Sequence, residues 1–81
     1  MYVVYVLRSL VNKRLYIGQT NNIDRRLLEH NEGHSHYTRL TKPFELVYRE
    51  EFSTRSDAVN RELELKSGKG REWLKVILAV G

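Results

Sequence analysis

The stretch YVVYVLRSLVNKRLYIG, residues 2–18, decides the fold of this chain. Its two ends, residues 2–7 and 15–18, consist of β-branched, aromatic and other apolar side chains that are typical of strands. The segment 11–14 between them is mostly polar and interrupts this pattern. The stretch therefore predicts a β-hairpin.

Three residues of the predicted hairpin stand out. Tyr5 and Tyr16 share one face if the numbers of paired residues sum to an odd value, and a sum of 21 would make them direct partners. Both are also consistent with ordinary core or half-exposed aromatic residues. Gly18, inside a strand pattern, indicates a bulge or the close approach of a ligand to the backbone.

A short helix and a loop are predicted after the hairpin. Asn21 and Asn22 offer a helix N-cap, Asp24 would lie in the first turn, and Gly33 marks the end. The following stretch, residues 33–43, has no apolar period and is polar and basic. It predicts a surface loop, and loops of this length often carry function.

A third strand is predicted for residues 44–52, where β-branched and aromatic residues return. We expect Leu46 and Tyr48 on one face of this strand and Val47 on the other. Together with the hairpin, this strand would complete a sheet of three antiparallel strands.

Two helices are predicted for the rest of the chain. Thr54, with Asp57 three residues later, is a capping signal for a helix that we expect to run to Ser67. Gly68-Lys69-Gly70 would break it, and the apolar positions of residues 71–80 predict the second helix. The predicted order is ββαβαα, an α+β fold with a small three-stranded antiparallel sheet flanked by helices.

Composition favours a single domain, residues 1–81. A chain of 81 residues with 41% hydrophobic residues has room for one core. The absence of Cys excludes disulfide scaffolds, cysteine nucleophiles and zinc ribbons. No apolar run approaches the ~18 residues of a membrane span, and no secretory leader opens the chain. We therefore expect no membrane association and an intracellular, cytoplasmic protein.

Positive charge is concentrated in the first half of the chain. The 14 Lys and Arg residues outnumber the 10 Asp and Glu residues, and the whole excess lies before Pro43. Such an excess suits a polyanionic partner such as nucleic acid, although an ordinary solvated basic surface has the same composition. The candidate nucleic-acid contacts are Arg8, Lys13, Arg14, Arg25, Arg39 and Lys42.

Two polar residues of the first predicted helix lie beside its apolar stripe. At ~100° per residue, Arg26 and His30 stack four residues apart next to Ile23, whereas Arg25 points to solvent. Arg26 could reach the sheet and act on a ligand, or its stem could cover apolar surface. His30 is also consistent with a hydrogen-bonded histidine at the boundary of the core.

Glu62 is the sharpest outlier of the second predicted helix. The same arithmetic places it in the middle of the apolar stripe that contains Ala58 and Leu65, where an unpaired carboxylate is costly. A metal-binding or catalytic role would explain this position. A structural ion pair with Arg26 or Lys66 would explain it as well.

Together these outliers supply the parts that phosphodiester hydrolysis needs. A carboxylate holds a hard divalent cation, a phenol or an imidazole takes a proton from water, and an arginine stabilises charge on a phosphate. The candidate catalytic residues are Tyr5, Tyr16, Arg26, His30 and Glu62.

The same residues carry a family resemblance, because the chain resembles the GIY-YIG endonuclease domain over nearly its whole length. Tyr16-Ile17-Gly18 matches the second signature of that superfamily outright. Val3-Val4-Tyr5 occupies the place of the first signature, with its Gly and Ile replaced and its Tyr kept. Arg26 and Glu62 resemble the catalytic arginine and the metal-binding glutamate of the family, and His30 matches a histidine of many members.

The resemblance implies a metal-dependent endonuclease that acts on nucleic acid, with DNA as the expected substrate, and leaves 5′-phosphate and 3′-hydroxyl ends. The cofactor it implies is Mg²⁺ or Mn²⁺, bound by Glu62. The implied roles are water activation by Tyr5, orientation of phosphate or water by Tyr16, charge neutralisation by Arg26 and proton transfer by His30.

The layout of the chain is most similar to the compact, stand-alone bacterial members of the superfamily. The nuclease domain of structure-specific junction endonucleases is also similar, which points to repair or recombination substrates. The chain shows none of the appended DNA-selecting domains of other relatives, so a protein partner or a homodimer is a candidate for supplying specificity. The rival interpretation is a nucleic-acid-binding or protein-interaction module on the same fold, with weak or no catalysis.

Overall fold

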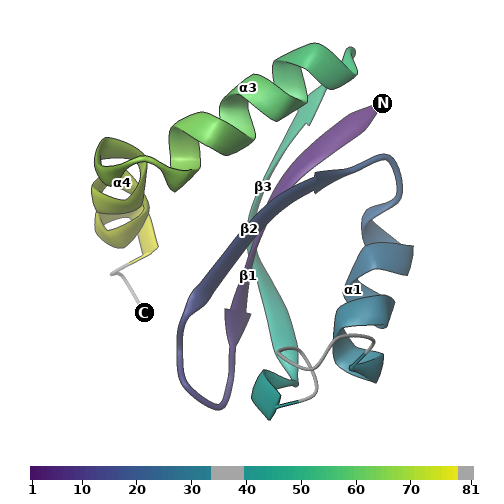
Figure 1. Cartoon of the computed structure of the whole chain (residues 1–81), viewed down its shortest axis with the longest axis vertical. Helices are drawn as coiled ribbons and strands as arrows, with labels where there is room; N and C mark the ends of the chain where they lie inside the picture. Colours follow the sequence, from purple (N-terminus) through teal and green to yellow (C-terminus); the bar gives the residue numbers. More distant parts are fainter. Residues whose placement is uncertain (34–39, 79–81) are drawn as a thin grey trace.

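A computed structural model describes residues 1–33 and 40–78 of the chain. In chain order its elements are β1 (Tyr2–Ser9), β2 (Leu15–Thr20), α1 (Ile23–Glu32), β3 (Phe44–Phe52), α3 (Arg55–Lys66) and α4 (Gly68–Leu78). The strands form one antiparallel sheet in the order β2-β1-β3 (Figure 1). The predicted α+β fold and the ββαβαα order are confirmed. Within the described ranges, none of the helices has the length and apolar character to span a membrane.

The register of the hairpin decides how its two tyrosines meet. Tyr5 pairs with Gly18, and Tyr16 pairs with Leu7. Paired residue numbers therefore sum to 23, which is odd, so the two tyrosines share a face as predicted. They are diagonal neighbours and not direct partners, and the residue opposite Tyr5 is the glycine.

A bulge in the pairing of β1 with β3 changes which side chains share a face of β3. Val6 pairs with Tyr48, but the next residue, Leu7, pairs with Leu46, so Val47 is the extra residue. Leu46 packs in one cluster of the core, and Val47 and Tyr48 pack in the other. The prediction that Leu46 and Tyr48 share a face is therefore wrong, because the extra residue inverts the alternation.

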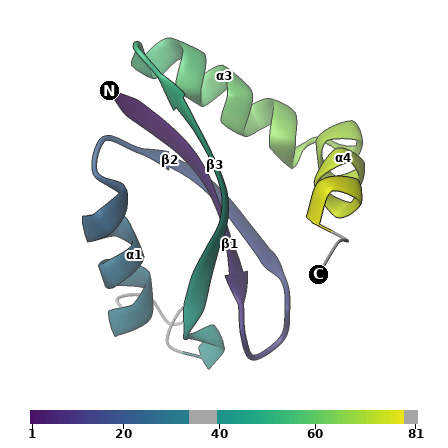
Figure 2. The same cartoon turned by 180° about the vertical axis from the view of Figure 1, so that it is seen from behind.

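Different helices cover the two faces of the sheet (Figures 1 and 2). On one face, α3 and α4 bury three side chains against the strands, namely Ala58, Leu65 and Leu74. On the other face, α1 packs Ile23 and Leu27 against a cluster that includes Tyr5. The hairpin tyrosines therefore lie on the α1 side of the sheet.

The ends of α1 and the start of α3 follow the local sequence signals. The Asn22 side chain accepts a hydrogen bond from the Arg25 amide (3.0 Å), which caps the start of α1. Gly33 ends that helix in the left-handed region with φ of 71°. The Thr54 hydroxyl accepts from the Asp57 amide (3.2 Å) and caps α3. The predicted caps are therefore confirmed.

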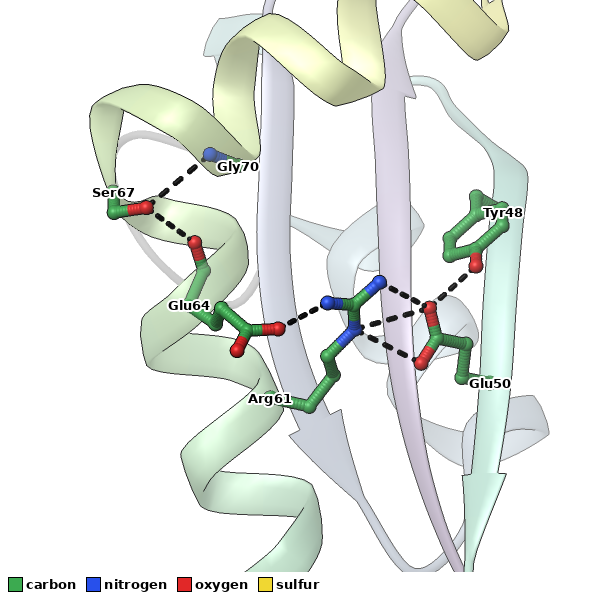
Figure 3. A network of polar contacts seen from close by, with 6 residues as sticks. All are labelled: Tyr48, Glu50, Arg61, Glu64, Ser67 and Gly70. Carbon is green, nitrogen blue, oxygen red and sulfur yellow. Dashed lines mark hydrogen bonds and ion pairs between the residues drawn. The ribbon is translucent and has the colours of Figure 1, made fainter.

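The junction between α3 and α4 differs from the prediction. Ser67 alone separates the two helices. The segment Gly68-Lys69-Gly70, predicted as the break between them, forms the first turn of α4. The Ser67 hydroxyl caps this turn by accepting from the Gly70 amide (3.2 Å), as Figure 3 shows. Gly70 lies so close to α3 that a Cβ there would be 2.5 Å from the Cα of Leu65. The glycine therefore serves close helix packing.

Candidate active site

The hairpin contributes two phenols, Tyr5 and Tyr16, and a glycine, Gly18, that makes room for the ring of Tyr5. Tyr5 is only 3% exposed, whereas Tyr16 is 37% exposed on the same face. The Tyr5 ring lies across Gly18, where a Cβ would be 2.7 Å from the ring Cζ and closer still to the hydroxyl oxygen. Gly18 therefore leaves room for a neighbouring side chain, Tyr5, and the predicted alternative of a bulge at this residue is not what the pairing shows.

Helix α1 contributes an imidazole beneath these phenols. His30 is 7% exposed, and its ring meets that of Tyr16 edge-on at a centroid distance of 4.7 Å. It also lies 6.3 Å from the ring of Tyr5 and 5.6 Å from that of Phe44. Neither ring nitrogen has a hydrogen-bond partner among the described residues, so the imidazole is buried but not hydrogen-bonded there.

Arg26 lies one turn before His30 on the same side of α1. It is half-buried, and its Nε is buried without a hydrogen-bond partner in the described parts of the chain. Arg25, in contrast, is exposed and forms an ion pair with Glu29 at 3.8 Å. The predicted difference between the two arginines is confirmed.

Glu62 lies at the rim of the apolar face of α3. Ala58 and Leu65 are fully buried, but the Glu62 side chain is 19% exposed. The prediction that Glu62 sits in the middle of the core stripe is therefore wrong, because the side chain reaches solvent at the edge of that stripe. Of the two candidate ion-pair partners, Lys66 is the one present, with its Nζ 2.6 Å from the Glu62 Oε2.

Charge effects link Arg26 and Glu62 to Tyr5. Burial raises the pKa of Tyr5 to about 12, opposed by the Arg26 guanidinium and assisted by Tyr16, Glu62 and Glu29. Tyr5 is therefore a neutral phenol at pH 7. Since charges act on it from α1 and α3, Tyr5 is the residue around which the candidate site is assembled.

His30 is neutral as well. Burial lowers its pKa below the usual 6.5, the positive charge of Arg26 lowers it further, and Glu29 acts in the opposite direction. A neutral imidazole can both donate and accept a hydrogen bond. The buried part of the site thus combines an uncharged phenol and an uncharged imidazole beside a guanidinium.

The chemistry of Glu62 fits a hard divalent cation. Its Oε2 accepts from Lys66, while its Oε1 has no hydrogen bond to a described residue. Over residues 1–33 and 40–78, no three His, Asp or Glu side chains converge into a metal cage. Mg²⁺ does not need such a cage, because it is commonly held by one or two carboxylates together with water and substrate phosphates.

The predicted nucleic-acid contacts fall on two separate surfaces. Arg8, Lys13 and Arg14 line a groove of about 940 Å³ between the hairpin and α4. Arg8 is also bound to Glu45, with its Nη2 2.9 Å from Oε1. Arg25 lies at a second, smaller pocket. Lys42 is exposed, and Arg39 lies outside the described residues.

Three basic residues at these surfaces were missed by the sequence analysis. Arg71 and Lys75 of α4 line the large groove, and Arg55 lines the small pocket. All three lie in the half of the chain where basic and acidic residues balance, so composition did not mark them. The fold brings Arg71 and Lys75 next to the hairpin and Arg55 next to the start of α1, so their contribution to the basic surfaces appears only in the folded structure.

A polar network that sequence reasoning also missed braces α3 against β3. Arg61 Nη2 lies 3.0 Å from Glu50 Oε2, and the same guanidinium binds Glu64 on its own helix (Figure 3). Tyr48 donates to Glu50, and the Arg61 guanidinium lies 5.1 Å from the ring centre of Trp73. The network fixes Arg61, the residue next to Glu62, and no pattern within α3 or β3 alone indicated it.

Comparison with known proteins shows which family and which relatives the sequence resembles. The sequence matches the family model of the GIY-YIG catalytic domain over residues 1–75. It is 40% identical over 75 residues to a UPF0213 protein of Staphylococcus haemolyticus, covering 91% of this chain and 90% of that protein. A UPF0213 protein of Natronomonas pharaonis is 48% identical over 65 residues, covering 79% of this chain and 75% of its own length.

A solved structure shows the same similarity in three dimensions. The solution NMR structure of the UPF0213 protein BH0048 from Bacillus halodurans superposes with a TM-score of 0.57 at 33% sequence identity, covering 95% of this chain and 85% of that one. The fold is a small α+β domain with a three-stranded antiparallel sheet. The chain belongs to the GIY-YIG catalytic domain family, which is a family of endonucleases.

Proposed function

We propose that this protein is a metal-dependent endonuclease that hydrolyses phosphodiester bonds of nucleic acid, with DNA as the preferred substrate. The observation that carries the proposal is the gathering of Tyr5, Tyr16 and His30 in ring contact, with the charges of Arg26 and Glu62 acting on Tyr5. A phenol, an imidazole, a guanidinium and a carboxylate are the groups that metal-assisted hydrolysis of a phosphodiester uses.

Glu62 is the proposed ligand of the cation. Mg²⁺ or Mn²⁺ held by Glu62 would polarise the scissile phosphate and favour deprotonation of a nearby phenol or water. Lys66 shares the Glu62 carboxylate by an i,i+4 ion pair. Because the Lys66 side chain is 43% exposed, it can leave this carboxylate at little cost.

Tyr5 is the proposed activator of the attacking water. Its pKa of about 12 means that it begins as a phenol, and positive charge is required to draw its proton away. Arg26 already acts in that direction. Arg26 is also the proposed stabiliser of the charge that develops on the phosphate, and the missing hydrogen-bond partner of its Nε among the described residues supports this role.

Tyr16 and His30 support these steps. Tyr16 is the exposed phenol of the pair and orients the phosphate or the water. His30 is neutral because burial lowers its pKa, and it transfers a proton or forms a hydrogen bond within the cluster. Substrate choice is left to the basic surfaces or to a second chain, either a protein partner or another copy of this one.

Purified protein incubated with labelled single strands, duplexes, flaps and junctions tests the proposal. We expect cleavage with Mg²⁺ or Mn²⁺ and none in chelator. Arg26→Ala should lower the rate by ~10²–10³, which is typical of losing a positioned charge stabiliser. The matched control, Arg25→Ala, should mainly weaken binding because Arg25 is exposed whereas Arg26 is half-buried.

Two results of this assay would count against the proposal. Binding of nucleic acid without cleavage of any member of the panel would favour a binding module. Equal loss of rate in the two arginine variants would remove Arg26 from the catalytic site.

A further inference from the structure

A small polar pocket lies at the end of the sheet where α1 and α3 both begin. Its volume is about 240 Å³. In Figure 1 this is the end at which the chain enters β1 and leaves β2 and β3. The residues that line the pocket are Tyr2, Gln19, Thr20, Asn21, Arg25, Arg26 and Arg55.

The lining of this pocket is cationic. Arg25 and Arg26 come from the first turn of α1, and Arg55 is the first residue of α3. Among the residues that the structure describes, none of those lining this pocket is acidic. Arg55 forms no ion pair or hydrogen bond with any residue in the described parts of the chain, and the buried Nε of Arg26 has no hydrogen-bond partner there. Three arginines thus line one small pocket, and of these Arg25 has an ion pair with a carboxylate of the described residues, Glu29, at 3.8 Å.

Such a lining matches one class of ligand. Guanidinium groups donate hydrogen bonds in a planar fork that fits phosphate oxygens, and these charge-assisted bonds are stronger than neutral ones. Gln19 and Asn21 add amides, and Tyr2 adds a hydroxyl, all of which can bond phosphate or sugar oxygens. An apolar or cationic ligand would find nothing here to offset the three positive charges.

We infer that this pocket binds a second phosphate of the nucleic acid, adjacent along the same strand to the phosphate that is cut. This inference rests on the proposed function. Arg26 links the two places, because it lines the pocket and its charge also acts on Tyr5 and His30. A phosphate held beside Arg26 would fix the position of the neighbouring phosphate over the candidate active site.

Arg55 is a positioning residue in this arrangement. It touches the flanking phosphate and not the reacting atoms, so its loss should raise KM more than it lowers kcat. Because Arg55 is exposed and has no partner among the described residues, Arg55→Ala should fold with an unchanged melting temperature. Lys69→Ala is the matched control, since Lys69 is an exposed cation that lines neither the pocket nor the groove.

A chemically altered substrate gives the most specific test. We expect Arg55→Ala to lower kcat/KM by about 10-fold, carried by KM, as for one charge-assisted hydrogen bond, and Lys69→Ala to leave it unchanged. A neutral methylphosphonate placed beside the cut should cause at least as large a loss in the unmodified protein, because Arg25 and Arg26 lose the same charge, and a smaller loss in Arg55→Ala than in the unmodified protein. Additive losses for a methylphosphonate at every position flanking the cut, or equal behaviour of Arg55→Ala and Lys69→Ala, would overturn the inference.

A second measurement separates this inference from the proposed function. Inorganic phosphate is titrated in chelator while the guanidinium NMR signals of Arg26 and Arg55 are followed, so no cleavage is required. We expect both signals to shift in a saturable manner, and Arg55→Ala to weaken the binding. If these shifts occur in a protein that cuts nothing, the phosphate site stands and the nuclease proposal fails. If the protein cuts but the shifts are absent, the phosphate site is overturned and the nuclease proposal stands.

Discussion

Tyr5 and Gly18 face each other across the first two strands, and each explains the other. The ring of Tyr5 occupies the volume that a side chain at position 18 would need. Glycine is required at position 18 for space and not for backbone conformation. Among the described glycines, the one with positive φ is Gly33, whereas the φ of Gly18 is not positive. The glycine within the strand pattern predicted a bulge or the approach of a ligand, whereas the group that lies against Gly18 is the side chain of Tyr5.

Gly18→Ala should therefore damage the site more than the fold. The new Cβ would force the Tyr5 ring to move, and displacing a catalytic group by about 1 Å can cost 10²-fold in rate. The strain should also lower the free energy of unfolding by about 1–3 kcal/mol. Cleavage assays and urea unfolding measure the two effects.

The control for this substitution is Gly68→Ala, where a Cβ would meet nothing within 4 Å. It should retain full activity. Full activity in Gly18→Ala would show that the position of the Tyr5 ring is not critical.

His30 should make the stability of the protein depend on pH. Burial and then Arg26 lower its pKa below 6.5, so the unfolded chain binds a proton at a pH where the folded chain does not. The stability that His30 contributes is fully present above its unfolded pKa of ~6.5 and is lost as pH falls toward the lowered folded value. Urea unfolding of the unmodified protein should give a smaller free energy at about pH 5 than at about pH 7.

His30→Gln separates this effect from that of the acidic residues. The pKa of Glu50 is lowered below 4.5: burial alone would raise it, but the hydrogen bonds from Arg61 and Tyr48 outweigh that effect. The contribution of Glu50 is therefore lost only at lower pH. His30→Gln should have a flatter profile between about pH 7 and about pH 5, and an unchanged profile would contradict a buried, neutral His30.

At the scale of elements, local signals predicted most of the fold. Asn22, Gly33 and Thr54 mark helix ends by hydrogen bonds within a few residues, so a sequence shows them. The range 44–52 for β3 was also predicted correctly. The extra residue Val47 could not be predicted, because a bulge depends on how two strands pair and not on the order of side chains in one of them.

The candidate site divides in the same way. Helical periodicity placed Arg26 and His30 on the side of α1 that faces the sheet, because that angle is a local property. It could not give the depth of Glu62, which depends on how α3 lies against the sheet. The network of Glu50 and Arg61 joins residues 11 apart in the chain, and nothing local indicated it.

Gly70→Ala tests the junction of α3 and α4. A Cβ at this position would lie 2.5 Å from the Cα and 2.8 Å from the carbonyl carbon of Leu65, and neither backbone atom can move freely. We expect a loss of about 1–3 kcal/mol in the free energy of unfolding, because the two helices must separate. Gly68→Ala, two residues earlier in the same turn, should be neutral or slightly stabilising, since alanine favours a helix. Equal stability of the two variants would contradict the close packing of α4 on α3.

At the scale of the whole molecule, the basic residues form two separate surfaces. One is the groove between the hairpin and α4, and the other is the pocket where α1 and α3 begin. The turn of the hairpin and the start of α3 lie at opposite ends of the sheet (Figure 1). A nucleic-acid backbone that contacts both would pass along the length of the molecule, and its binding should weaken steeply with salt.

The central claim is that Glu62 serves a cation and not the fold, and Glu62→Gln tests it most directly. The side chain keeps its volume and loses a partly exposed ion pair with Lys66, which is worth about 0–1 kcal/mol. Glu51→Gln is the matched control, because it removes another surface ion pair, that of Arg49 with Glu51. The measurement is the melting temperature in chelator and in Mg²⁺ or Mn²⁺, with cleavage assayed in parallel.

We predict that Glu62→Gln and Glu51→Gln melt within a few degrees of the unmodified protein in chelator. Only Glu62→Gln should lose both cleavage and the rise in melting temperature that the cation produces by binding the folded state. A Glu62→Gln protein that cleaves normally but melts well below the unmodified protein in chelator would make Glu62 a structural partner of Lys66 and would contradict the metal-dependent mechanism.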